Sequence, residues 1–273
     1  MSRFSRVPGR SGLTALAVAC ILFGIPGLSP QVPPAPAGAD SIAVDLNLPA
    51  YRLAVWAGDS LIDQFTVAIG ARRYPTPIGE FALKRVELNP GWIPPASDWA
   101  RDQSPMPPGP RNPMGRAKLE FHPTYYLHGT PAPESVGSAA SHGCVRLRND
   151  DVLALAEHLL RWGRPQDADS AAGWVMHPTM RRRLPLDRGA GLTIRYDLLE
   201  IRSDRIYVWP DPYRLRSDST DARAQADLAA ALGTHQIPER LAARLLDAAR
   251  DQPLDISVDS VMRGLIADPA AED

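Results

Sequence analysis

Hydrophobic and polar positions alternate along much of the chain between residues 41 and 215. A period of two places apolar side chains on one face of a β-strand, whereas a helix repeats them every three or four positions. Strand-like segments occur at residues 42–46, 51–55, 65–69, 81–86, 119–127, 192–196 and 206–209. Gly58 and Asp59 separate the second segment from the third and predict a hairpin turn. The pattern therefore predicts a mostly β domain.

One helix is predicted inside this β-rich region. Residues 149–151 offer an N-cap and an acidic first turn, and apolar residues then follow at helical spacing to about Gly163. Residues 166–191 are polar and irregular, and we expect a loop region there. Within it, we expect the three arginines at residues 181–183 to form a solvated surface.

The chain changes character near Leu215, where Ala and Leu become frequent. Residues 221–232 and 238–249 show helical spacing and predict short helices. The expected organisation is a leader at residues 1–39, a β-rich domain at residues 40–215 and a helical extension at residues 216–273.

The leader has the features of an export signal. Arginines precede an apolar run at residues 13–28, and the small residues Ala37 and Ala39 predict a cleavage site before Asp40. An uncleaved membrane anchor is the competing interpretation, although the run is short for a full span. Either interpretation places the protein in the periplasm or cell envelope. The net charge of -1 provides no general attraction to nucleic acid or to a membrane surface.

Residues 89–118 interrupt the strand pattern with eight prolines, which exclude a regular helix or a central strand. Trp92 and Trp99 lie within this segment. Long irregular insertions in compact domains are usually lids or disordered, and aromatic residues favour a lid. We therefore expect a lid over a cleft, with Trp92 or Trp99 facing the substrate. The alternative is that both tryptophans fill the core.

Candidate chemistry centres on Cys144, the only cysteine outside the leader. If residues 141–147 run extended, His142, Cys144 and Arg146 share one face, whereas Val145 and Leu147 point into a core. A thiol between an imidazole and a guanidinium is expected to have a lowered pKa and to react as a thiolate. The alternative is a small buried cysteine without a catalytic role.

A cysteine nucleophile needs a base, and only His128 and His142 are expected to flank Cys144, through neighbouring strand ends. His122 shares the face of His128 by strand parity and could support the site from behind. No acidic residue is placed to orient the base, so a backbone carbonyl is the candidate. A zinc site formed by these three histidines and Cys144 is a weaker hypothesis, because no acidic general base accompanies it at a recognisable spacing.

These residues carry a family resemblance. The sequence His128-Gly129-Thr130, followed by a loop and residues 141–146 (SHGCVR), resembles the active-site motif of L,D-transpeptidases with a YkuD-type catalytic domain. Residues 76–81 (TPIGEF) resemble the family's TPxGxF signature. Residues 92–95 and 108–115 are similar to segments of periplasmic, ErfK/YbiS-like members. The resemblance covers roughly residues 41–212, and the helical extension has no counterpart in it.

The resemblance implies a β-sandwich or barrel-like catalytic domain with few helices. By position, Cys144 would be the nucleophile and His128 its base, oriented by the carbonyl of Gly129. His142 would shape the site. Backbone N–H groups of Gly143 and Cys144 would form the oxyanion hole.

The resemblance also implies what the protein acts on. Arg146 would bind substrate carboxylates, and Ser141 and Trp92 would contact the substrate. The acyl donor and acceptor would be peptidoglycan stem peptides, with a wall-anchored protein as another acceptor. No cofactor or metal is implied, because one amide is exchanged for another through a thioester. The alternatives are an L,D-carboxypeptidase or amidase on the same scaffold, and a non-catalytic wall-binding protein.

Overall fold

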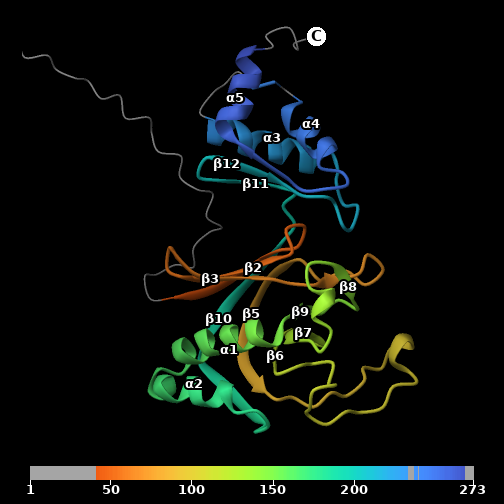
Figure 1. Ribbon diagram of the computed structural model, residues 1–273, viewed down its shortest axis with the longest axis vertical. Helices are drawn as coiled ribbons and strands as arrows, with labels where there is room; N and C mark the ends of the chain where they lie inside the picture. Colours follow the sequence, from red (N-terminus) through yellow and green to blue (C-terminus); the bar gives the residue numbers. More distant parts are fainter. Residues whose placement is uncertain (1–40, 233–236, 239, 268–273) are drawn as a thin grey trace, which may run out of the picture.

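A computed structural model describes residues 41–232, 237–238 and 240–267 (Figure 1). The predicted leader at residues 1–39 lies outside the described residues. Within the described ranges, no helix combines the length and the apolar character that a membrane span requires.

The main structure is an eight-stranded sheet with the strand order β3-β2-β1-β10-β5-β6-β7-β9. The strands, in chain order, are β1 (Ile42–Asn47), β2 (Arg52–Ala57), β3 (Ser60–Thr66), β5 (Gly79–Leu88), β6 (Ala117–His122), β7 (Tyr125–Gly129), β9 (Val145–Leu147) and β10 (Arg182–Arg195). The pairs β1–β10 and β7–β9 are parallel and the other neighbours are antiparallel. Ala68, just after β3, forms a bridge with Arg146 of β9. The sheet thus nearly closes into a barrel, and the mostly β, barrel-like prediction is confirmed.

Two short strands, β4 (Ile69–Gly70) and β8 (Ala139–Ser141), pair in parallel beside this closure. β2 and β3 form the predicted hairpin around Gly58 and Asp59.

The core lies between one face of the sheet and helix α1 (Asn149–Gly163). The predicted apolar positions of α1 are buried, because they face the sheet: Val152, Leu155, Ala156 and Leu159. Helix α2 (Ala168–Met176) packs against α1. Residues on the opposite face of β5, β6, β7 and β9 are polar and line a cavity, so the alternation of each strand separates the core from a candidate site.

The prediction of an irregular region at residues 166–191 is wrong, since it contains α2 and most of β10. The alternation in β10 is real, with Leu184, Leu186, Leu192 and Ile194 buried, but a bulge between Pro185 and Ala190 interrupts it. The bulge and the charged outer face hide this long central strand from a pattern search.

The predicted strand at residues 119–127 is also wrong, because the structure contains a hairpin there. β6 ends at His122, β7 begins at Tyr125, and Thr124 between them has a φ of 71°. His122 and His128 therefore lie on neighbouring antiparallel strands.

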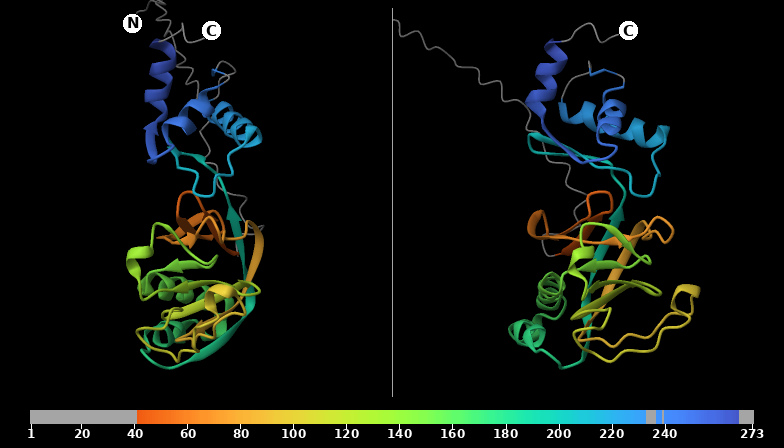
Figure 2. Two further views of the ribbon diagram at one scale, coloured as in Figure 1. Left: turned by 90° about the vertical axis from the view of Figure 1, so that its right-hand side faces the viewer. Right: turned by 45° about the vertical axis from the view of Figure 1, so that its right-hand side comes forward.

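A second, smaller unit lies at one end of the long axis of the molecule (Figures 1 and 2). Its sheet has the order β11-β12-β13, and its three helices are α3, α4 and α5. The bounds are β11 (Leu199–Arg202), β12 (Arg205–Val208), α3 (Asp218–Leu232), α4 (Leu241–Ala248), β13 (Leu254–Ser257) and α5 (Val258–Ala267). Its core is separate from the first and begins at Leu198. The change of core therefore precedes the expected boundary at Leu215.

The two units are joined by buried polar contacts. Glu200 of β11 contacts Arg52 Nη2 at 2.8 Å and Arg195 Nη2 at 2.6 Å. Asn47 Nδ2 donates to the same carboxylate at 2.7 Å. Tyr213, which follows the second sheet's first two strands, returns to the first core. The second unit is thus attached through residues of the first sheet itself.

Candidate active site

Cys144 lies in a loop between two strands. The expected extended run at residues 141–147 is interrupted, since β8 ends at Ser141 and β9 starts at Val145. Gly143 has a φ of +102°, and a Cβ there would meet Cε1 of Tyr125 at 2.6 Å, so only glycine fits. Val145 and Leu147 are fully buried, as expected. Their burial directs Arg146 to the polar face, with Cys144 just before the strand.

Ser141 holds this loop together. Its side chain is buried, and its hydroxyl donates to the Cys144 carbonyl oxygen at 2.5 Å while accepting the Gly143 N–H at 3.0 Å. Both contacts are internal, and Ser141 also lines the cavity beside Cys144. In this conformation the Gly143 N–H donates to Ser141, so the expected substrate contact of Ser141 and oxyanion-hole role of Gly143 stay predictions.

Thr76, the first residue of the TPIGEF motif, is a second anchor of the loop. Its hydroxyl accepts the Gly70 N–H at 2.9 Å and donates to the Gly143 carbonyl at 3.0 Å. Its own N–H donates to the hydroxyl of Tyr213 at 3.1 Å. The only available signal was the TPIGEF motif itself, because the partners of Thr76 are remote in sequence.

His128 is a buried residue of β7, next to Gly129. Its Nδ1 lies 2.6 Å from the Gly129 carbonyl oxygen. Since a carbonyl only accepts, Nδ1 carries the proton and Nε2 is left as an acceptor. Burial lowers the pKa of His128 to about 4, against the opposing effect of the Gly129 carbonyl. The imidazole is therefore neutral at pH 7, in the tautomer that a general base requires.

The thiol of Cys144 does not have the expected lowered pKa. Burial raises the pKa of Cys144, and the backbone N–H of Tyr126 and the cations of Arg146 and Lys118 only partly offset this. Sγ donates to the Thr124 carbonyl oxygen at 3.7 Å. The correction has a simple cause: the sequence reveals the neighbouring charges but not the extent of burial. At pH 7, the thiol and the imidazole are therefore both neutral.

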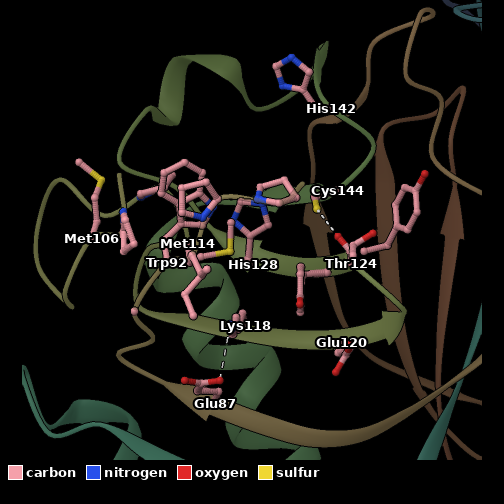
Figure 3. Close-up of a pocket in the computed structure, with 18 of the residues that line it drawn as sticks. Glu87, Trp92, Met106, Met114, Lys118, Glu120, Thr124, His128, His142 and Cys144 are labelled. Atoms are coloured by element: carbon pink, nitrogen blue, oxygen red, sulfur yellow. Dashed lines mark hydrogen bonds and ion pairs between the residues drawn. The ribbon is translucent and has the colours of Figure 1, made fainter. Parts of the chain in front are cut away.

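Cys144 and His128 line one cavity of about 1450 Å³ (Figure 3). Arg146 lines it too, and burial lowers the pKa of its guanidinium. In the part of the chain that the structure describes, no carboxylate pairs with this guanidinium. An arginine in such a position is suited to a carboxylate of a bound ligand.

The proline-rich segment forms one wall of the same cavity. Trp92 is 92% covered, and its backbone pairs with that of Met106. The ring of Trp99 stacks on that of His142, with centroids 4.1 Å apart and planes at 13°. Neither tryptophan belongs to the main core cluster. Trp99, more than Trp92, contacts the loop that carries Cys144.

The two other candidate histidines, His122 and His142, make contacts with aromatic rings. The ring of His122 lies against those of Phe81 and Tyr125, whereas His142 is exposed between Tyr74 and Trp99. Among the described residues, no three His, Cys, Asp or Glu side chains lie close enough to hold a metal ion. The zinc hypothesis therefore lacks its ligand set in this geometry.

Comparisons with known proteins agree with the motif. The family model of the L,D-transpeptidase catalytic domain (YkuD) matches residues 41–188. The probable L,D-transpeptidase ErfK/SrfK of Salmonella typhimurium is 31% identical over 156 residues, which are 52% of this chain and 50% of that protein. The probable L,D-transpeptidase YbiS of Escherichia coli K12 is 35% identical over 129 residues, or 44% and 42% of the two proteins.

The chain spans about half the length of the curated relatives it matches. Among solved structures, the catalytic domain from the E. faecium L,D-transpeptidase aligns with a TM-score of 0.36 and 15% identity, covering 57% of this chain and 98% of that one. The family match contains Cys144, His128 and Arg146 and ends before the second unit.

Proposed function

Since the chain belongs to the L,D-transpeptidase catalytic domain family, we propose that it exchanges amide bonds of peptidoglycan stem peptides through a thioester on Cys144. The observation that carries this proposal is the shared cavity of Cys144 and His128, in which the Gly129 carbonyl fixes the base in its accepting tautomer. The acceptor amine comes from a second stem peptide or from a wall protein.

The reaction begins with both groups neutral. Sγ attacks the carbonyl carbon of the donor amide while Nε2 of His128 takes the thiol proton. The C–N bond then breaks, and the imidazolium protonates the leaving amine. The acceptor amine attacks the carbonyl carbon of the thioester while His128 takes its proton, the C–S bond breaks, and the imidazolium returns the proton to sulfur, which restores the thiol. Because one amide replaces another, the cycle requires no external energy source.

The raised pKa of Cys144 and the lowered pKa of His128 both oppose a resting ion pair. Proton transfer is therefore concerted with attack, when the substrate carbonyl becomes the new partner of sulfur. Arg146 holds a carboxylate of the donor beside the reacting bond. His142, held between Tyr74 and Trp99, positions the donor at the cavity mouth.

The proposal is tested with purified tetrapeptide-bearing wall fragments and intact-protein mass spectrometry. We expect a thioester adduct on Cys144 and cross-linked products. Release of the terminal residue without cross-links would instead identify an L,D-carboxypeptidase. Cys144→Ala should form no adduct and should change the free energy of unfolding by about 1 kcal/mol or less. Normal turnover in Cys144→Ala would refute the nucleophile.

The base is tested by comparing His128→Gln with His142→Gln in single-turnover acylation. Loss of a general base slows a reaction by about 10²- to 10⁴-fold, so His128→Gln should show a loss of that size. A larger loss in His142→Gln would assign the base to His142 instead.

A further inference from the structure

A row of charged side chains crosses the floor of the cavity. Neighbouring strands place five residues in direct register, each opposite the next: Arg183 of β10, Glu87 of β5, Lys118 of β6, His128 of β7 and Arg146 of β9. Directly opposed residues point to the same face of a sheet. All five line the cavity, and Figure 3 shows Glu87, Lys118 and His128 along one line.

The neighbouring row of residues shows that the charged row lies on the face of the sheet opposite the core. The adjacent row consists of Leu184, Val86, Leu119, Leu127 and Val145, all of them buried in the main core. The charged row therefore points away from α1 and into the cavity. Of the three arginines expected to form a solvated surface, Arg181 and Arg183 are partly exposed but also line this cavity, whereas Arg182 does not.

Positive charge exceeds negative charge at the end of the row furthest from Cys144. Glu87 contacts Arg181 Nη2 at 2.7 Å, Arg183 Nε at 3.4 Å and Lys118 Nζ at 3.6 Å. Burial alone would raise the pKa of Glu87, but the surrounding cations hold this pKa below its ordinary value. One charged carboxylate thus faces three cations. The side chains of Arg181 and Arg183 remain 47% and 62% exposed and line the cavity.

We propose that Lys118, Arg181 and Arg183 form a carboxylate-binding subsite, which we call the basic end, for an acidic peptide whose amide is attacked at Cys144. This inference rests on the proposed function and adds a second anchoring point to it. Arg181 already donates two hydrogen bonds, at 3.0 and 2.7 Å, to one oxygen of Glu87. The cations are therefore held in an orientation suited to carboxylates.

The spacing sets the length of the ligand. Three strand spacings of about 4.8 Å place Arg183 roughly 14 Å from His128 along the row. An extended peptide rises about 3.4 Å per residue, so this distance corresponds to about four residues. Arg146 binds a carboxylate near the scissile bond, and the basic end binds one about four residues away.

The test compares two synthetic pentapeptide donors, each with four residues on the acyl side of the scissile bond, that differ in one group. The residue furthest from the scissile bond carries either a free carboxylate or a carboxamide. Arg181→Gln/Arg183→Gln should lower kcat/KM for the carboxylate donor roughly 10- to 100-fold, mainly through KM, and leave the carboxamide donor unchanged. Glu87→Gln removes the internal competitor and should lower KM for the carboxylate donor.

Arg182→Gln is the matched control. Arg182 lies between the two tested arginines, but its guanidinium lies 5.3 Å from the ring centroid of Trp174, outside the cavity lining. Both donors should react normally with this variant. Equal losses for the two donors in Arg181→Gln/Arg183→Gln, or an equal loss in Arg182→Gln, would overturn the subsite.

Arg181→Gln/Arg183→Gln leaves Lys118 as the one remaining ion-pair partner of Glu87 among those described. If this double variant fails to fold, adding Glu87→Gln removes the buried charge that lost its partners. Calorimetry with the full chain carrying Cys144→Ala measures the affinity of each peptide in the absence of turnover. Preferential binding of the carboxylate peptide, lost in the arginine double variant, supports the basic end even if no thioester forms. Thioester formation without any preference between donors supports the proposed function and refutes the basic end.

Discussion

Replacing Thr76 by valine removes one hydroxyl of nearly unchanged shape at the base of the catalytic loop. The change deletes the acceptor of the Gly70 N–H and the donor to the Gly143 carbonyl, in a residue that is 2% exposed. Each lost bond is worth about 1 kcal/mol, and a buried N–H without an acceptor costs about 1–3 kcal/mol. We expect Thr76→Val to lower the free energy of unfolding by about 2–4 kcal/mol.

The same change should slow acylation, because Thr76 holds the carbonyl of Gly143, the residue directly before Cys144. Small displacements of a reacting group cost up to about 10²-fold in rate, and we expect a roughly 10- to 100-fold loss. Urea denaturation measures the first effect, and thioester formation at a temperature where the variant stays folded measures the second.

Thr193→Val is the matched control, since the Thr193 hydroxyl donates to Glu80 at 2.8 Å in an exposed position. Its stability should change by less than about 0.5 kcal/mol. If Thr76→Val behaves like Thr193→Val in both assays, the anchoring role of Thr76 is wrong. A loss of stability with normal acylation would confine Thr76 to the fold.

Three other perturbations test the geometry. The pKa of buried His128 is about 4 in the folded state and near 6.5 when unfolded, so its contribution to stability should be fully present above pH 6.5. The free energy of unfolding should then fall by about 3 kcal/mol as the pH falls to 4. A denaturation series in which His128→Gln shows the same dependence on pH as the wild type would contradict this. Truncation after Leu215 should expose the apolar residues of β11 and β12 and increase the binding of a hydrophobic dye, and a truncated chain without increased dye binding would contradict the packing of β11 and β12 against α3 and α4. Trp99→Ala should reduce kcat/KM with little change in Tm, whereas Trp92→Ala should lower Tm more, and the reverse order in melts and kinetics would exchange the two roles.

Sequence patterns predicted those strands and helices whose formation depends on neighbouring residues alone. Alternation located β1 and β2, expected at residues 42–46 and 51–55, but it placed the third strand at residues 65–69, whereas β3 is Ser60–Thr66 and pairs with β2 across a bulge between Val55 and Trp56. The acidic first turn and apolar spacing predicted α1 almost to its last residue. The resemblance led us to expect His128 and Cys144 in one site. Both line the same cavity, because β7, which carries His128, pairs with β9, which begins directly after Cys144.

Other properties depend on burial and on contacts between distant residues. The sign of the pKa shift at Cys144 is set by burial, which outweighs Arg146 and Lys118. Arg183 joins the cavity floor only because β10, far along the chain, inserts between β1 and β5. No local pattern contains that insertion. A run of arginines in the sequence is therefore compatible with a solvated surface and with a binding subsite, and only the register distinguishes them.

The boundary between the two units shows the same limit in another form. β11 and β12 read as a continuation of the β-rich domain, yet they pair with β13, whose residues follow α4. After β12 the chain returns to the first unit. There the hydroxyl of Tyr196 donates a hydrogen bond to the carboxylate of Asp211 and accepts one from the N–H of Tyr213. Tyr213 accepts from Thr76, which in turn donates to Gly143. A continuous series of contacts thus runs from the segment after β12 to the loop of Cys144. A chain shortened to end before Tyr213 would therefore lose a support of the catalytic loop, even though it retained every strand of the first sheet.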